Sequence, residues 1–180
     1  RTNKINDIQT VLADEHFDLS IHFLVEEEVL NHATALEHVA RQVQGPILVS
    51  HGDIFITPPH LDLPPDEDNC YIYVSSYYKP ERISRYGVVE LTDDRRVVSF
   101  EEKPPHPKGK FVHMGVTFFP GDIGDKIANL ENKTEKNMVD VANEYLKEGR
   151  LFGLVHSQPW FNMGTPEEVL EAAIFRRNQV

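Results

Sequence analysis

The sequence predicts a layered α/β fold built on a mixed sheet, and three observations support this prediction. Segments with apolar residues at helical spacing alternate along the chain with short segments rich in β-branched and aromatic residues. Turn residues such as Gly45-Pro46 and Asp93-Asp94 separate these segments. The strands on either side of Asp93-Asp94 resemble hairpin partners, which makes at least one strand pair antiparallel and the sheet mixed.

The first part of the chain contains two expected helices and three expected strands. Apolar residues at helical spacing predict a first helix with one face formed by Ile5, Ile8, Val11 and Leu12. Strict alternation then predicts a half-buried strand that carries Phe17, Leu19, Ile21 and Phe23. Asn31 is the expected N-cap of a helix over Ala33–Val43, which ends at Gly45-Pro46. The next strands are Ile47–Ser50 and "CYIYVSSY", and the proline-rich acidic loop "LDLPPDEDN" lies between them.

The second part of the chain adds four expected strands and two expected helices. The strands are "YGVVEL", "RVVSFEEK", "FVHMGVTFF" and "RLFGLVH". The helix "KNMVDVANEYLKEG" stops at Gly149 and directs inward its residues Met138, Val141, Ala142 and Tyr145. The final helix, "TPEEVLEAAIFRRN", has Thr165 as N-cap, Pro166 in its first turn and Glu168 as the acid of a capping box.

Composition narrows the class of protein. A chain of 180 residues is expected to form one domain, over residues 1–180, with a substantial core. Its 29 acidic and 18 basic residues give a net charge of −11, which argues against nucleic acid or an anionic membrane as a partner. No apolar run approaches the ~20 residues that span a bilayer. The single cysteine, Cys70, and a start without a secretion signal predict a cytoplasmic protein.

The strand Ile47–Ser50 runs directly into Gly52-Asp53, which places a carboxylate where an apolar core would otherwise continue. In α/β sheets, ligands gather at the carboxyl ends of strands. Gly52 lets a ligand approach the backbone, and Asp53 is a suitable oxygen donor for a hard cation such as Mg²⁺. A turn-forming aspartate without a function is the alternative.

Four stretches follow one another along the chain: "ILVSHGD", "YGVVELTDDRRVVSFEEKP", "HMGVTFF" and "WFNMGTPEEVLEA". Together, and in register, they resemble the sugar-1-phosphate nucleotidyltransferases. The family shows Gly-Asp, Tyr-Gly-Val-Val, Glu-Lys-Pro, a glycine-containing strand and Trp-x-Asp-x-Gly-Thr-Pro-Glu in this order and at similar separations. The resemblance covers nearly the whole chain from about Phe17 onward. It implies a three-layer, Rossmann-like mixed sheet of the nucleotide-diphospho-sugar transferase type.

The resemblance also implies a reaction, in which an NTP and a sugar 1-phosphate give an NDP-sugar and pyrophosphate. Asp53 would then bind Mg²⁺, and Asp53 and Lys103 would be the catalytic residues, with Lys103 on the sugar phosphate. Glu102 would accept hydrogen bonds from sugar hydroxyls, and the substrate would also contact Tyr86, Gly87 and Gly115. Strand alternation places Glu102 and Lys103 on opposite faces, so the "EEKPP" turn is expected to redirect one of them.

The sequence departs from the family in three places. The family opens with a glycine-rich loop that binds nucleotide phosphates, and no such loop occurs here, which predicts a fragment of a longer chain or a truncated relative. In "LNHATAL", which corresponds to the segment that contacts the base, Asn31, His32 and Thr34 replace the two glycines and the threonine of the family. They could donate to a base or block it. Asn162 stands where the family usually has a second acidic metal ligand, and its neutral oxygen would bind Mg²⁺ more weakly.

Three functions remain open at this point. The first is a nucleotidyltransferase, active as the complete protein and inactive as these 180 residues alone. The second is a binding or regulatory relative without turnover, which Asn162, the altered "LNHATAL" and the absent loop favour. The third is a cytidylyltransferase of the same fold that acts on an alcohol phosphate such as phosphocholine. The base, the sugar and the presence of a homo-oligomer cannot be read from the sequence.

Overall fold

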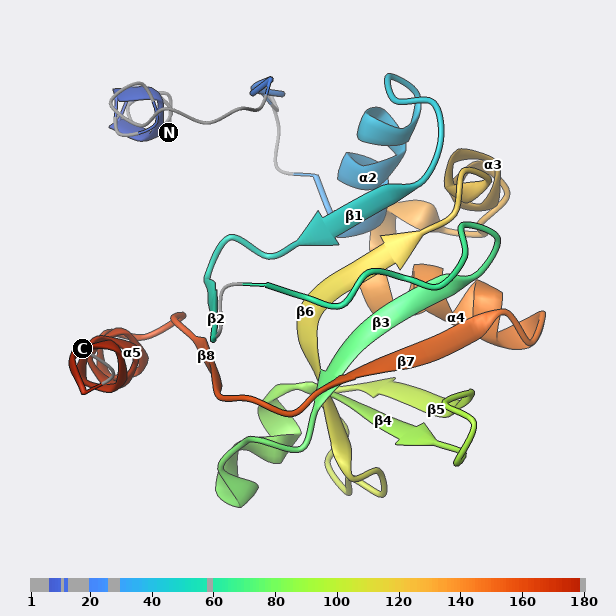
Figure 1. Ribbon diagram of the computed structural model, residues 1–180. Coiled ribbons are helices and arrows are strands. Elements are labelled where there is room, and N and C mark those ends of the chain that lie inside the picture. Colours follow the sequence, from blue (N-terminus) through green and yellow to red (C-terminus); the bar gives the residue numbers. More distant parts are fainter. Residues whose placement is uncertain (1–6, 11, 13–19, 26–29, 58–59, 179–180) are drawn as a thin grey trace.

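A computed structural model describes residues 7–10, 12, 20–25, 30–57 and 60–178. Within these residues the main element is a six-stranded sheet of order β5-β4-β6-β3-β7, with β1 also paired to β6 (Figure 1). The pair β3–β7 is parallel, whereas the other pairs are antiparallel, so the predicted mixed sheet is confirmed. Its strands are β1 (Ile47–Ser50), β3 (Cys70–Ser75), β4 (Gly87–Leu91), β5 (Val97–Glu102), β6 (Phe111–Phe119) and β7 (Leu151–His156).

Strand β6 organises the sheet because it pairs along both of its edges. One edge of β6 pairs with β3, in a register that shifts between Ile72 and Val74. The other edge pairs first with β4, near Val112, and then with β1, from Val116 to Phe119. The carboxyl end of β1 and the amino end of β4 therefore meet along the same edge of β6.

Three helices cover one face of the sheet: α2 (His32–Ala40), α3 (Ile123–Ala128) and α4 (Met138–Lys147) (Figure 1). Their apolar side chains pack against alternate residues of β3, which are Cys70, Ile72 and Val74. A short 3-10 helix, η2 (Lys133–Glu135), precedes α4. This face contains the larger core, whose largest fully buried side chains include Tyr145, Phe119, Ile72, Ile123, Ile127 and Leu151.

The opposite face is covered by a second, two-stranded sheet. Its strands, β2 (Ile54–Ile56) and β8 (Trp160–Asn162), are antiparallel. Trp160 packs there against a smaller core that contains Tyr73 of β3 and, from β6, Val112, Met114 and Val116. The 3-10 helix η1 (Pro80–Arg85) and helix α5 (Pro166–Arg177) complete this side, as Figure 1 shows for α5 beside β8. No helix among the described residues is long and apolar enough to cross a membrane.

Several predicted helix boundaries are confirmed. Asn31 caps α2, because its Oδ1 accepts a hydrogen bond of 2.9 Å from the backbone N–H of Thr34. The helix ends at Ala40, a few residues before the predicted Val43. Gly149 follows α4 with a φ of +70°, as expected for a C′ glycine.

Two predictions are wrong. Residues 20–25 were predicted to belong to a strand, but they have no regular structure, and the side chains of Ile21 and Phe23 are 44% and 40% exposed. A strand needs a hydrogen-bonding partner, and no described strand pairs with these residues. Glu168 does not complete a capping box, because its carboxylate lies 3.0 Å from Nη1 of Arg85 instead.

Some predictions fall on residues that the structure does not describe. Residues 7–10 and 12 are helical, in agreement with the first predicted helix, but Ile5 and Val11 lie outside the described residues. Phe17 and Leu19 of the predicted first strand also lie outside them.

Candidate active site

Asp53 lies in the turn between β1 and β2, where its side chain is exposed. Its carbonyl oxygen accepts a hydrogen bond of 2.6 Å from the backbone N–H of Met163. In the adjacent register position, Ile54 of β2 pairs with Asn162 of β8. The small β2–β8 sheet therefore brings Asp53 and Asn162 together, although they are far apart in the sequence.

The side-chain oxygens of Asp53 and Asn162 face the same space beside Gly164. A Cβ added to Gly164 would lie 3.2 Å from Oδ1 of Asn162 and 3.7 Å from Oδ2 of Asp53. The same Cβ would lie 3.7 Å from Oε2 of Glu168, whose other oxygen pairs with Arg85. We call Asp53 and Asn162 the oxygen pair. It offers one carboxylate and one amide oxygen to this space, which suits a hard cation such as Mg²⁺.

The oxygen pair alone is an incomplete set of protein ligands. Among the described residues, no group of three or more His, Cys, Asp or Glu side chains could hold a metal ion. The Oδ1 atom of Asn162 also accepts a hydrogen bond of 3.0 Å from the N–H of Gly164, which orients the amide. A cation held here would therefore take further ligands from water or from a bound phosphate, as Mg²⁺ commonly does.

Glu102 and Lys103, which we call the hairpin end, lie at the open end of the β4–β5 hairpin, opposite its turn. The backbone of Lys103 turns into the left-handed region, with φ at +46°, and its N–H donates to the carbonyl of Tyr86 at 3.0 Å. This turn places Nζ of Lys103 3.2 Å from Oε1 of Glu102. The predicted redirection of one of the two side chains is therefore confirmed.

Gly87 pairs with Glu102 across the β4–β5 hairpin. A Cβ at Gly87 would lie 2.7 Å from the Phe100 ring and 3.4 Å from both Oε2 of Glu102 and Cβ of His113. The packing of Phe100 therefore requires glycine at position 87. The Glu102 carboxylate lies close to the same position. The predicted contact of Gly87 with a substrate stays a prediction.

His51, which the sequence analysis did not select, lies at the centre of the predicted residues. Burial and the neighbouring His32 lower the pKa of His51, while the carboxylates of Asp53 and Glu102 oppose this change and Lys103 reinforces it. The His51 imidazole is thus within electrostatic reach of both the oxygen pair and the hairpin end. Its position directly before Gly52-Asp53 is the sequence signal that could have identified it.

Gly115 provides the space that the His51 imidazole occupies. Gly115 has a φ of +80°, and an added Cβ would lie only 2.8 Å from Nδ1 of His51. The carbonyl of Gly115 accepts a hydrogen bond of 2.9 Å from the N–H of His51. The positive φ and the contact with His51 both favour glycine at this position, and the predicted contact of Gly115 with a substrate stays a prediction.

A third histidine, His113, lies beneath His51, with 6.5 Å between the ring centroids. Its Nε2 lies 3.0 Å from both the carbonyl of Val116 and Oγ1 of Thr117. Burial lowers the pKa of His113 to about 4, so its imidazole is neutral at pH 7. His113 is therefore a fixed, uncharged support for the site.

Tyr86 lies on the Asn162 side of the site, away from its sequence neighbour Gly87. Its ring meets the ring of Trp160 edge-on, with 5.6 Å between the centroids. Together they line a cavity of about 360 Å³ that also includes Asn162 and the buried carboxylate of Glu168. Glu168, absent from the predicted site, is therefore within reach of both this cavity and the oxygen pair.

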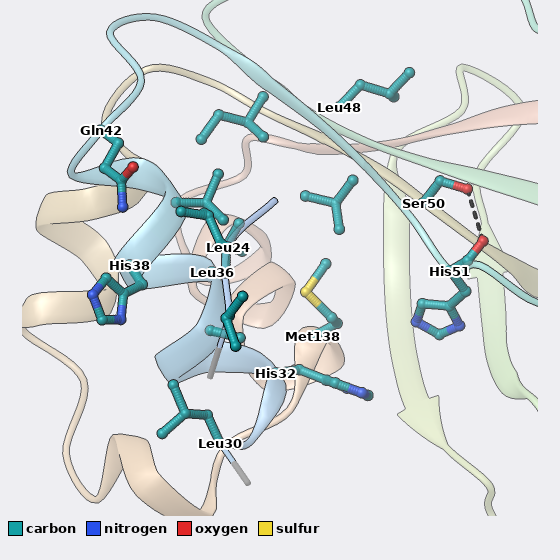
Figure 2. Close-up of a pocket in the computed structure, with 15 residues that line it drawn as sticks. Leu24, Leu30, His32, Leu36, His38, Gln42, Leu48, Ser50, His51 and Met138 are labelled. Carbon is teal, nitrogen blue, oxygen red and sulfur yellow. Dashed lines mark hydrogen bonds between the residues drawn. The ribbon is translucent and has the colours of Figure 1, made fainter. Parts of the chain in front are cut away.

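A larger cavity of about 910 Å³ lies between α2 and β1 (Figure 2). Its walls are mostly apolar and include Leu36, Leu48 and Met138. His32 and His51 line it as well, and their ring centroids are 5.7 Å apart. Asn31, predicted to contact the substrate, uses its Oδ1 atom to cap α2. This cavity can hold an apolar or aromatic group, with His32 and His51 among its polar contacts.

Comparison with known proteins gives a family match across the chain. The family model described as nucleotidyl transferase matches residues 3–179. The bifunctional protein GlmU of Methanocaldococcus jannaschii is 27% identical over 154 residues, which cover 84% of this chain and 36% of GlmU. A glucose-1-phosphate thymidylyltransferase of Mycobacterium tuberculosis is 34% identical over 98 residues, or 52% of this chain and 34% of its own length. The chain thus spans about a third of the length of these curated relatives.

Two solved structures share the fold. A Bacillus anthracis protein assigned as a glucose-1-phosphate thymidylyltransferase, in complex with sucrose, matches with a TM-score of 0.80 and 22% identity, over 96% of this chain and 72% of that one. A UDP-glucose pyrophosphorylase in complex with UDP-glucose matches with a TM-score of 0.73 and 15% identity, over 100% of this chain and 74% of that one. At these identities the likeness shows the fold alone, and it agrees with the fold class predicted from the sequence.

Proposed function

The chain belongs to the nucleotidyl transferase family, and we propose that its protein joins an NTP to a sugar 1-phosphate, giving an NDP-sugar and pyrophosphate. The curated relatives named for thymidylyl transfer to glucose 1-phosphate support this choice of substrates. The observation that carries the proposal is the arrangement around His51, where Asp53 of the oxygen pair and the two residues of the hairpin end lie near the same imidazole.

The chemistry of this reaction suits the residues present. The nucleophile is a phosphate oxygen that is already anionic, so the site needs no general base. The main barrier is the repulsion between two polyanions, followed by the charge that develops on the α-phosphate. In a chain with a net charge of −11, this barrier makes the few cationic groups at the site important.

Mg²⁺ would be held by Asp53 and Asn162, whose oxygens face the space beside Gly164. When bound, it would neutralise phosphate charge. Because asparagine supplies no charge, the affinity of this site for Mg²⁺ would be lower than that of a site with two carboxylates. Met163 and Gly164 hold the two donors in place through hydrogen bonds to the Asp53 carbonyl and the Asn162 amide.

The hairpin end would bind the sugar 1-phosphate. Lys103 would contact the phosphate, and Glu102 would accept hydrogen bonds from the sugar hydroxyls. The distance of 3.2 Å between Nζ of Lys103 and Oε1 of Glu102 lets each residue orient the other. The nucleotide would lie on the side of His32, at the end of the larger cavity where His51 also lies. We place the reaction in the cytoplasm, which the single cysteine of the sequence supports.

The test is pyrophosphate release by the natural protein, with every residue that its gene encodes. Each of ATP, CTP, GTP, TTP and UTP is combined with glucose 1-phosphate, with N-acetylglucosamine 1-phosphate, with phosphocholine, and with no acceptor, at millimolar Mg²⁺. The proposal predicts that pyrophosphate is released only when both substrates are present. It also predicts that the Asp53→Asn variant has lost most of this activity. Release without an acceptor would contradict it, as would activity with only CTP and phosphocholine, which would favour the cytidylyltransferase.

A binding relative without turnover is the second candidate, and the neutral Asn162 favours it. It predicts a different result in the same experiment. An NDP-sugar would bind to the protein, measured by calorimetry, while no combination of substrates would release pyrophosphate. Release above the Asp53→Asn background would exclude this candidate.

A further inference from the structure

His32 and His51 form a pair of imidazoles that the proposed reaction does not require. His32 is the first residue of α2, and His51 directly follows β1. Their ring centroids are 5.7 Å apart, with the planes inclined by 42°. Both side chains line the larger cavity, and Figure 2 shows the His32 imidazole extended toward that of His51.

We propose that His32 and His51 form a two-histidine binding site for a late first-row transition-metal ion, for which Zn²⁺ is the natural probe. Two imidazoles that share one tetrahedral Zn²⁺, with Zn–N bonds of about 2.0–2.1 Å, have ring centres roughly 5 Å apart. The observed separation of 5.7 Å is slightly larger than this value, and rotation of the two side chains can close the difference. Both imidazoles can therefore reach one ion without a change in the backbone.

Hydrogen bonds hold the backbone at both histidines. The N–H of His51 donates to the carbonyl of Gly115 at 2.9 Å, and His51 fills the space left by the missing Gly115 side chain. His32 begins a helix that is capped by Asn31. The two ligands are thus presented by the end of a strand and the start of a helix, which limits the entropy lost when an ion binds.

The electrostatic surroundings favour a bound cation. The carboxylates of Asp53 and Glu102 act on His51 from nearby, and their negative charge outnumbers the positive charge of Lys103.

The two-histidine site is chemically distinct from the oxygen pair. Imidazole nitrogens select Zn²⁺, Ni²⁺ or Cu²⁺, whereas carboxylate and amide oxygens suit Mg²⁺. His113 does not join the site, because its Nε2 is engaged by Val116 and Thr117. No third His, Cys, Asp or Glu among the described residues completes a metal group. Water would therefore fill the remaining positions and leave the ion open to further ligands.

The test measures Zn²⁺ binding to the metal-free natural protein by competition with a fluorescent chelator, with no nucleotide present. It compares His32→Asn and His51→Asn with a matched control, His38→Asn, because His38 lies on the same helix and lines the same cavity. We expect each of the first two changes to weaken Zn²⁺ binding at least tenfold, and His38→Asn to change it less than twofold. Unchanged binding in the His32→Asn/His51→Asn double variant would overturn the proposal.

A second measurement uses the unaltered protein, so its result does not depend on whether a variant folds. In the unaltered protein with ¹⁵N-labelled histidine, one equivalent of Zn²⁺ should shift the ring signals of two histidines and leave the other seven of the nine in place. Millimolar Mg²⁺ should leave the Zn²⁺ affinity within twofold. Shifts spread over many histidines, or competition by Mg²⁺, would contradict a separate site. Because neither measurement involves catalysis, the outcome is independent of the proposed function.

Discussion

Asp53 of the oxygen pair and the hairpin end both lie near His51, and the chain builds the two groups in different ways. The hairpin end is local, since β4 and β5 adjoin in sequence and pair from Gly87–Glu102 to Leu91–Val97. The oxygen pair depends on β2 and β8, two short strands from distant parts of the chain. One half of the site is therefore encoded in a single hairpin, whereas the other exists only in the folded protein.

The two halves also differ in how they are supported. Behind the hairpin end, Val89 and Phe100 are buried in the larger core. The residues of β2 are only half-buried, and the β2–β8 sheet is extended by two hydrogen bonds from Thr57 to the carbonyl of Pro159, one from N–H at 3.2 Å and one from Oγ1 at 2.5 Å. We expect the hairpin end to be rigid and the oxygen pair to adjust to its ligand.

The largest effect is expected for Asp53→Asn, which removes the only charge of the oxygen pair. Turnover should fall by about 10²–10³-fold, because the developing phosphate charge loses its main stabilising group. The unfolding midpoint should stay nearly constant, since the Asp53 side chain is exposed. The measurement is pyrophosphate release together with a thermal melt. Retained turnover at limiting Mg²⁺ would show that Asp53 is not a metal ligand.

Lys103→Ala tests the hairpin end in the same assay. The KM for the sugar 1-phosphate should rise by about 10–100-fold, because a hydrogen bond between charged groups is lost. The KM for the NTP should change much less, which separates this effect from that of Asp53→Asn. Equal increases in both KM values would mean that Lys103 does not distinguish the two substrates.

Gly115→Ala tests the support that both halves share. The change should lower the free energy of unfolding by about 2 kcal/mol, because alanine is strained at a φ of +80° and its Cβ meets His51. Adding His51→Ala removes the steric conflict and should restore part of the loss, while the backbone strain remains. Chemical denaturation of the single and double variants gives the coupling energy. Strictly additive effects would refute the contact between Gly115 and His51.

The smallest effect is expected for the left-handed backbone of Lys103. Lys103→Gly should raise the free energy of unfolding by about 0.5–1 kcal/mol, since glycine adopts this conformation without strain. It should lose the sugar-phosphate affinity as Lys103→Ala does. Arg95→Gly is the matched control, because Arg95 also has a positive φ, of 68°, in the turn of the same hairpin. Arg95→Gly should gain stability and keep full activity.

Sequence patterns predicted the local half of this arrangement better than the distant half. Strand alternation and the prolines after Lys103 predicted the hairpin, its turn and the redirection of Lys103, because these signals act within a few residues. Strands β2 and β8 were not predicted, because three residues are too few for a clear period. The central position of His51 and the burial of Glu168 depend on contacts with Gly115 and Arg85, which no local pattern encodes.

The central claim is that Asp53 and Asn162 jointly hold the cation on which nucleotidyl transfer depends. The most direct test is the Mg²⁺ dependence of pyrophosphate release for the natural protein and its Asn162→Asp variant. Two carboxylates should bind the ion more tightly, so the Mg²⁺ concentration for half-maximal activity should fall by about tenfold, equivalent to roughly 1.4 kcal/mol. Mn²⁺, which accepts mixed ligands more readily, should support the natural protein better than Mg²⁺. Identical Mg²⁺ curves for the two proteins would contradict the claim.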